Sequence, residues 1–189
     1  MEVISMLEAL ERSEEVKAVL EADGVIVFPT DTIYGVGSSA FSEKGLGVVR
    51  SLKERWGKPF SIIAPSKDWI RERFDLGRHE DWLGKLPGPF TLVFEPREPF
   101  SRQLSSSGAV GVRIPDHPIA ALVEKMGVPL VATSVNRSGF DPLSSLDQLR
   151  ESSYERFSKV AFAIDDGVKS GPASTVVDLT GERPVYVRM

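Results

Sequence analysis

The sequence predicts an α/β fold in which a mixed β-sheet carries helices on its faces. Three observations lead to this prediction. Short apolar or alternating runs have the length of strands, amphipathic stretches of helix length lie between them, and several strands follow one another closely near the end of the chain. Strands that alternate with helices are typical of α/β sheets. The closely spaced late strands favour a mixed sheet over an all-parallel one.

Two helices and three strands are expected in the first half of the chain. Apolar residues at helical spacing predict helices over 13–21 and 42–55, and Gly24 ends the first of them. Gly45 and Gly47 weaken the second helix. The continuous apolar run 25–28 predicts a buried strand that ends at Pro29. Two further runs of strand length lie at 60–64 and 90–94.

The second half begins with an alternating segment. Val110, Val112 and Ile114 recur with the period of a strand, which places Gly111 and Arg113 on the opposite face. Asp116 is expected to cap a helix that carries its apolar residues at 119, 122, 123 and 126 and ends at Gly127. Further strands are expected at 129–132, 160–164, 175–178 and 185–187.

Length and composition indicate one globular domain over residues 1–189. The chain has no cysteine, which excludes disulfides, zinc–thiolate sites and a cysteine nucleophile. Since it has only two histidines, we expect no transition-metal site, and His79-Glu80-Asp81 and Asp116-His117 are interpreted as ordinary polar residues. A Ser-His-Asp triad is rejected because no G-x-S-x-G elbow is present.

The N-terminal segment has no basic region followed by an apolar core, so it does not resemble a secretory signal. No apolar run reaches the ~20 residues of a membrane helix. We therefore expect a cytoplasmic protein that makes no membrane contact. The net charge of −4 argues against nucleic-acid binding over the whole surface.

Five polar segments interrupt or follow the strands: PTDTIYG (29–35), KERWGKP (53–59), GVRIPDHP (111–118), TSVNRSG (133–139) and GPASTVVD (171–178). Each has an ordinary structural explanation, such as a hydroxyl-stabilised turn at 30–32 or a solvated helix end at Lys53, Arg55 and Lys58. Ligands in open α/β sheets bind beyond strand ends, so their joint occurrence predicts a binding site. Arg113 is either an edge-strand residue facing water or a guanidinium that binds a carboxylate or phosphate on the floor of the site.

The segment 35–40 matches G-x-G-x-x-A after a strand. A dinucleotide-binding turn follows its strand directly, whereas PTDTIY intervenes here. We interpret this segment as a structural turn.

In this order, the motifs resemble those of the YrdC-like family, which includes the threonylcarbamoyl-adenylate synthases. The resemblance rests on PTDTIYGVG, Lys-x-Arg at Lys53 and Arg55, LPGPFTLVF, GVRIPDHP, Ser-x-Asn at Ser134 and Asn136, and STVVDLTG. It covers nearly the whole chain and implies a twisted mixed sheet with flanking helices around a deep, positive cavity.

The resemblance also implies which residues bind the substrates. L-Threonine would contact Thr30, Arg113, Ser134 and Ser174. ATP, with Mg²⁺ as cofactor, would contact Lys53, Arg55, Lys58, Asn136, Ser144 and Arg188. The catalytic residues would be Lys53, Arg55, Ser134 and Asn136. Threonine and bicarbonate would form a carbamate that attacks the α-phosphate and expels pyrophosphate, and a separate transferase would pass the product to tRNA.

Three departures from the family pattern bear on the site. Trp56 replaces a proline common after Lys-x-Arg, Ile63 lies about where some members place a threonine-contacting histidine, and the chain ends shortly after Arg188. We expect no additional C-terminal domain, so a lid would come from elsewhere. Two alternatives stay open: a YrdC-like RNA-binding module without catalysis, and a paralogue acting on another carbamoyl substrate. Direct RNA binding is expected to be weak and salt-sensitive at most.

Overall fold

A long mixed β-sheet runs through the computed structural model, which describes residues 1–54, 57–136, 141–150 and 155–189. Within these ranges its strands are β1 (Glu2–Ser5), β2 (Ile26–Phe28), β3 (Gly35–Gly37), β4 (Ser61–Ile63), β5 (Phe74–Asp75), β6 (Phe90–Pro96), β7 (Val110–Arg113), β8 (Leu130–Ser134), β9 (Phe162–Asp165), β10 (Thr175–Asp178) and β11 (Val185–Arg188). Their order is β1-β9-β2-β3-β8-β4-β7-β6-β10-β11, with β5 paired to β6. Parallel pairs such as β4–β7 lie beside antiparallel pairs such as β6–β7, so the predicted mixed α/β class is confirmed.

Helices cover both faces of this sheet. They are α1 (Met6–Glu11), α2 (Ser13–Glu21), α3 (Glu43–Lys53), α4 (Lys67–Arg73) and α5 (Ile119–Met126), with 3₁₀ helices η1 (Gly77–Lys85), η2 (Leu146–Arg150) and η3 (Glu155–Lys159). One core joins α1, α2 and α5 to one face of the sheet, and the other joins α3 and α4 to the opposite face. Neighbouring residues of β2 divide accordingly, since Val27 belongs to the second core and Phe28 to the first.

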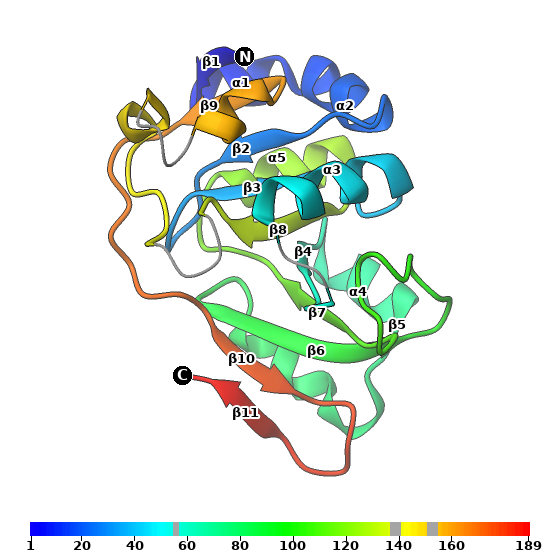
Figure 1. The fold of residues 1–189 in the computed structure, drawn as a ribbon. Helices are drawn as coiled ribbons and strands as arrows, with labels where there is room; N and C mark the ends of the chain where they lie inside the picture. The colour runs from blue at the N-terminus through cyan, green and yellow to red at the C-terminus, as the bar shows by residue number, and fades with distance from the viewer. Residues whose placement is uncertain (55–56, 137–140, 151–154) are drawn as a thin grey trace.

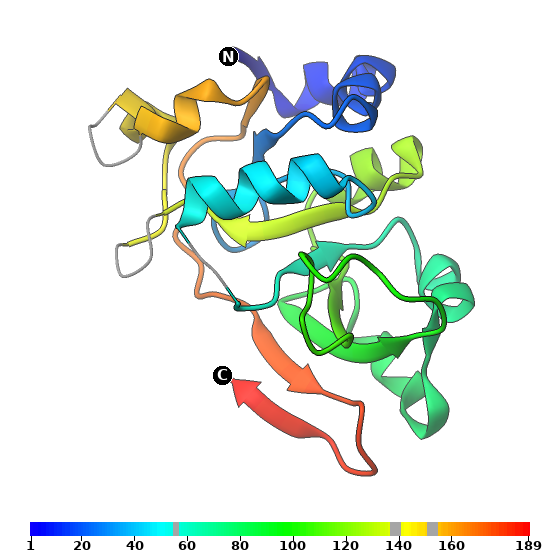
Figure 2. The same ribbon diagram turned by 45° about the vertical axis from the view of Figure 1, so that its right-hand side comes forward.

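The β9–β10 connection (residues 166–174) has no regular secondary structure. It joins strands near opposite ends of the sheet order and runs as an extended chain along one side of the molecule (Figures 1 and 2). Because β10 pairs with β6 and β11 pairs with β10, this connection carries the chain to the last hairpin of the sheet.

Most predicted elements occur near their expected positions, and three details differ. Helix α3 ends at Lys53, where Glu54 is the C-cap in a left-handed conformation with φ 49°; the expected last residue, Arg55, lies outside the described residues. Segment 35–37, interpreted as part of a turn, is strand β3. A Cβ on Gly37 would lie 1.6 Å from the carbonyl oxygen of Val131, so this glycine allows β3 to approach β8 closely.

The expected cap of α5 is also wrong. Pro118 is the N-cap residue, and its side chain makes no capping bond. His117 takes over the capping role, since its Nδ1 accepts the amide hydrogen of Ile119 at 3.1 Å. The backbone of Asp116 instead donates to Asp31 Oδ2 at 3.3 Å. The end of the helix is as predicted, with Gly127 at φ 66°.

Strand β1 and helices α1 and α4 were not predicted. Helix α1 begins with a capping box in which Ser5 and Glu8 bond each other's backbone amides. Its length of 6 residues is too short to show a clear apolar period. Among the described residues, no helix combines the length and the apolar character needed to cross a membrane.

Candidate functional site

A cavity of about 740 Å³ lies over one half of the sheet. Alternate residues of β6, β7 and β10 line it, which means that one face of these strands forms its floor. Its lining includes hydroxyl and guanidinium side chains that could bind a ligand, those of Thr30, Ser61, Thr91, Arg113, Ser134, Ser174 and Arg188. This face is open because α1, α2 and α5 pack against the other strands of the sheet. The site therefore covers a sheet face as well as the strand ends that the sequence predicted.

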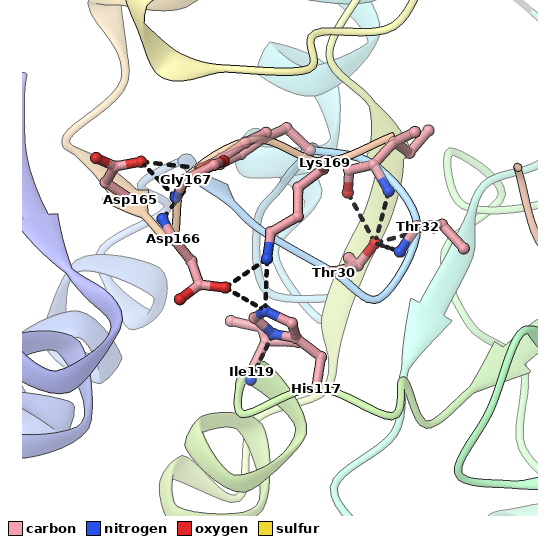
Figure 3. Close-up of polar contacts among 10 residues, drawn as sticks. Thr30, Thr32, His117, Ile119, Asp165, Asp166, Gly167 and Lys169 are labelled. Atoms are coloured by element: carbon pink, nitrogen blue, oxygen red, sulfur yellow. Dashed lines mark hydrogen bonds and ion pairs between the residues drawn. The ribbon is translucent and has the colours of Figure 1, made fainter. Parts of the chain in front are cut away.

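Thr30 stabilises its own loop and also borders the cavity. Its Oγ1 donates to the carbonyl oxygen of Ile33 at 2.7 Å and accepts the amide hydrogens of Thr32 and Ile33, each at 3.2 Å (Figure 3). Thr30 and Thr32 are both buried and both line the cavity. The hydroxyl-stabilised turn and the expected binding role are thus compatible.

Arg113 forms a buried ion pair with Asp31 at the edge of the cavity. Its Nη2 donates to Asp31 Oδ1, and the side chains of Arg113 and Asp31 are 8% and 12% exposed. The Nε of Arg113 is buried and has no hydrogen-bond partner among the described residues. A buried N–H group without an acceptor raises the free energy of the folded protein. A carboxylate ligand could supply the missing acceptor.

Electrostatics support an anionic ligand at this point. Burial lowers the pKa of Arg113, because the charged form loses hydration; Asp31 opposes this shift, and Arg188 adds to it by repulsion. Arg113 and Arg188 both line the cavity, so their charges act on the same enclosed space. The predicted orientation of Arg113, on the face shared with Gly111, is confirmed.

Lys53 joins the end of α3 to the end of β8. Its Nζ donates to the carbonyl oxygen of Ser134 and to Asn136 Oδ1, and lies 3.3 Å from Ser134 Oγ. Ser134 Oγ in turn donates to Asn136 Oδ1 at 2.6 Å. Lys53 is 2% exposed, so the ammonium group is held by polar atoms rather than by water. The structure thus brings together three of the four residues expected to be catalytic.

Ser174 belongs to a second polar network on the opposite wall. Its Oγ lies 2.8 Å from Thr91 Oγ1, and its carbonyl oxygen accepts hydrogen bonds from Arg188 Nε at 3.0 Å and Nη2 at 2.7 Å. The antiparallel pairing of β10 and β11 brings Arg188 to this position. Thr91 was not singled out from the sequence, because a single threonine within an apolar strand carries no distinctive pattern.

Four described residues that were expected to contact ATP do not line the cavity: Lys53, Lys58, Asn136 and Ser144. The side chain of Lys58 is exposed, while its carbonyl oxygen accepts a hydrogen bond from Arg50 Nη1 at 3.2 Å. Ser144 donates to Gln148 Oε1 at 3.0 Å on the neighbouring 3₁₀ helix. Arg55 and Trp56 lie outside the described residues.

Two other residues clarify the family comparison. Ile63, which lies about where some family members are expected to have a histidine, is fully buried in the core that contains α5 and is not part of the cavity lining. Asp31 was interpreted only as part of a turn, although it is the partner of Arg113. The signal for it was the acidic residue between two hydroxyl residues in PTDT.

The fold and the cavity define an α/β protein with two arginines, Arg113 and Arg188, in the lining of a cavity over its sheet. The family model Sua5/YciO/YrdC, described as telomere recombination, matches residues 18–189, and the chain belongs to this family. The expected YrdC-like resemblance is thereby confirmed.

Individual relatives agree with this assignment. A protein from Escherichia coli O1:K1 named threonylcarbamoyl-AMP synthase is 31% identical over 172 residues, covering 87% of this chain and 90% of that protein. The structure of P. abyssi Sua5 complexed with L-threonine matches with a TM-score of 0.84 and 28% identity over 100% of this chain. The structure of E. coli YciO matches with a TM-score of 0.82 and 25% identity, covering 95% of this chain and 89% of that one. This chain spans 57% of the Sua5 chain.

Proposed function

We propose that this protein is an L-threonylcarbamoyladenylate synthase, a nucleotidyltransferase that forms threonylcarbamoyl-AMP and pyrophosphate from L-threonine, bicarbonate and ATP. One observation carries the proposal: Ser134 lines the same cavity as Arg113 and is bonded to Lys53. Ser134 therefore connects the cavity that contains Arg113, the expected carboxylate-binding group, to Lys53, the expected phosphate-binding group. The names of the relatives, and the L-threonine bound to Sua5, support this choice of substrates.

Arg113 would hold the carboxylate of threonine, because its Nε is directed to no protein acceptor among the described residues. Thr30, Ser134 and Ser174 would contact the rest of the amino acid. Small hydroxyl side chains leave room for a ligand and offer both donors and acceptors.

Lys53 would hold the phosphate oxygens of ATP together with Asn136, Arg55, Lys58 and Arg188, and Ser144 would contact the nucleotide. The amine of threonine attacks the carbon of bicarbonate to give a carbamate and water. A carbamate oxygen then attacks the α-phosphorus, and the bond to pyrophosphate breaks. Positioned cations stabilise the charge that develops in such a transfer. Restricted access of water to the reacting groups would protect the labile carbamate.

Mg²⁺ would enter with ATP and neutralise part of the phosphate charge. Among the described residues, no group of three or more His, Asp or Glu side chains forms a metal site. Asp178 is a carboxylate of the cavity lining and would be the protein's oxygen ligand. This donor set fits Mg²⁺, which often keeps several waters and binds one or two carboxylates together with substrate phosphates.

The adenylate would pass to a separate transferase that modifies tRNA in the cytoplasm. The test is incubation of the protein with ATP, Mg²⁺, bicarbonate and L-threonine, with detection of threonylcarbamoyl-AMP by mass spectrometry and of pyrophosphate. Omission of threonine or of bicarbonate should abolish both products. Pyrophosphate release that is independent of threonine would contradict the proposal, and tight tRNA binding at physiological salt without turnover would favour an RNA-binding module.

A further inference from the structure

The β9–β10 connection has no secondary structure of its own, so contacts with other segments set its position. The amide of Asp166 donates to Tyr34 Oη at 3.0 Å, that of Lys169 to the carbonyl oxygen of Ser144 at 2.8 Å, and that of Gly171 to the carbonyl oxygen of Thr32 at 3.0 Å. Its last residue, Ser174, lines the cavity.

Asp166 and Lys169 of this connection form a compact cluster with His117, which precedes α5 (Figure 3). Lys169 Nζ donates to Asp166 Oδ2, and His117 Nε2 lies 2.9 Å from the same oxygen. Lys169 Nζ and His117 Nε2 are 3.3 Å apart. The side chains of His117 and Lys169 are 7% and 15% exposed, whereas that of Asp166 is 39% exposed, so the cluster lies at the surface with its two donors largely buried.

Both ring nitrogens of His117 are engaged. Nδ1 accepts the amide hydrogen of Ile119, which places the proton of a neutral imidazole on Nε2, where it is donated to Asp166. Lys169, followed by His117, lowers the pKa of Asp166, as expected for a carboxylate with two donors. Since no ring nitrogen is left for a substrate proton or a metal, the cluster is suited to fastening two segments together.

The two segments that the cluster joins both lead into the cavity. His117 follows Arg113 in segment 111–118, whose Asp116 amide donates to Asp31. On the other side, the connection lies directly against the loop at Thr32: a Cβ on Gly171 would be 3.0 Å from Thr32 Cα. Movement of the connection would therefore change the wall formed by the Thr30 loop and Ser174.

We propose that His117, Asp166 and Lys169 are positioning residues that fasten the β9–β10 connection to the start of α5 and thereby shape the amino-acid end of the cavity. The effect on substrates rests on the proposed function. The fastening itself depends only on the geometry of the cluster.

The test compares Lys169→Met with Lys169→Arg and with the control Lys44→Met. Lys44 also faces an aspartate, Asp23 at 3.4 Å, but its side chain is 84% exposed and is not part of the cavity lining. In Lys169→Met we expect the KM and the Kd for L-threonine to rise roughly 10-fold, which corresponds to about 1.4 kcal/mol. The KM for ATP should rise less than the KM for L-threonine, because the bonds of Lys53 to Ser134 and Asn136 do not involve the connection, and only Arg188 bonds to it, through Ser174. Lys169→Arg should restore most of the threonine affinity.

Hydrogen exchange provides a readout that does not require activity. In Lys169→Met the amides of Lys169 and Gly171 should exchange on the order of 10-fold faster, while those of β9 stay unchanged. Because the bond between His117 and Asp166 crosses between the segments, His117→Phe should have at least the same effect on exchange, and unchanged exchange in both variants would refute the fastening. Faster exchange with equal changes in the KM for threonine and for ATP, or with no change in either, would refute the role at the amino-acid end. If the wild type shows neither threonine-dependent turnover nor threonine binding, the proposed function and the role at the amino-acid end are both refuted. The exchange data then still show whether the cluster fastens the connection to the start of α5.

Discussion

Replacement of Arg113 by lysine probes the amino-acid end of the cavity. The guanidinium of Arg113 uses Nη2 for Asp31 and leaves Nε without a partner among the described residues. A lysine at this position keeps the positive charge that Asp31 requires. It removes the planar pair of donors that can bind a carboxylate through two parallel bonds.

The expected effect follows from the hydrogen bond that is lost. A bond to a charged group contributes about 1.5–3 kcal/mol, so the Kd for L-threonine should rise roughly 10- to 150-fold. The Kd for ATP should change by less than about threefold, because the phosphate contacts are assigned to other residues. Arg113→Ala should also unfold more easily, by about 3–5 kcal/mol, because it leaves the carboxylate of Asp31 buried without its cation.

Calorimetry should measure the binding of L-threonine and ATP separately for wild type, Arg113→Lys and Arg113→Ala. Thermal unfolding of each variant separates loss of binding from loss of folding. In the control Asp31→Asn/Arg113→Met, stability should partly recover, since neither partner is left charged, while threonine binding stays weak. If Arg113→Lys keeps its threonine affinity and loses ATP affinity, the residue belongs to the nucleotide and the assignment above is wrong.

Three further predictions address the phosphate end, the sheet and the β9–β10 connection. Lys53→Met should lower kcat by about 10²–10³-fold at unchanged helicity by circular dichroism, and a wild-type rate would show that Lys53 is only structural. Gly37→Ala should destabilise the fold by roughly 3 kcal/mol, since the new Cβ would lie 1.6 Å from the carbonyl oxygen of Val131. In the control Gly84→Ala, the new Cβ would have no atom within 4 Å, so the melting temperature should change little. Burial raises the pKa of Tyr34, so stability should be fully present below about pH 10 and decline above it, as the unfolded tyrosine ionises and the folded one does not. Melting curves at pH 8 and pH 11 should show a smaller decline for Tyr34→Phe, and an equal decline would contradict this reading.

Local sequence patterns determined the elements whose signals lie within a few residues. The helix expected over 13–21 is observed with those bounds, and Gly127 ends α5 as predicted. The orientation of Arg113 was also readable, because side chains alternate along a strand whatever its neighbours are. The motifs that carry the family resemblance are equally local, and the resemblance implied that Thr30, Arg113, Ser134 and Ser174 share one site. All four line the cavity.

Only the tertiary structure decided the contacts between segments that are far apart in the chain. Segment 35–37 is a strand because it pairs with β2 on one side and with β8, which begins at Leu130, on the other. Asp31 pairs with Arg113 because the order of the strands brings their two segments together. No local sequence pattern encodes that order. The cluster of His117, Asp166 and Lys169 likewise joins α5 to the β9–β10 connection. Periodicity reports which face a residue occupies, whereas the partner on that face depends on how the whole sheet is assembled.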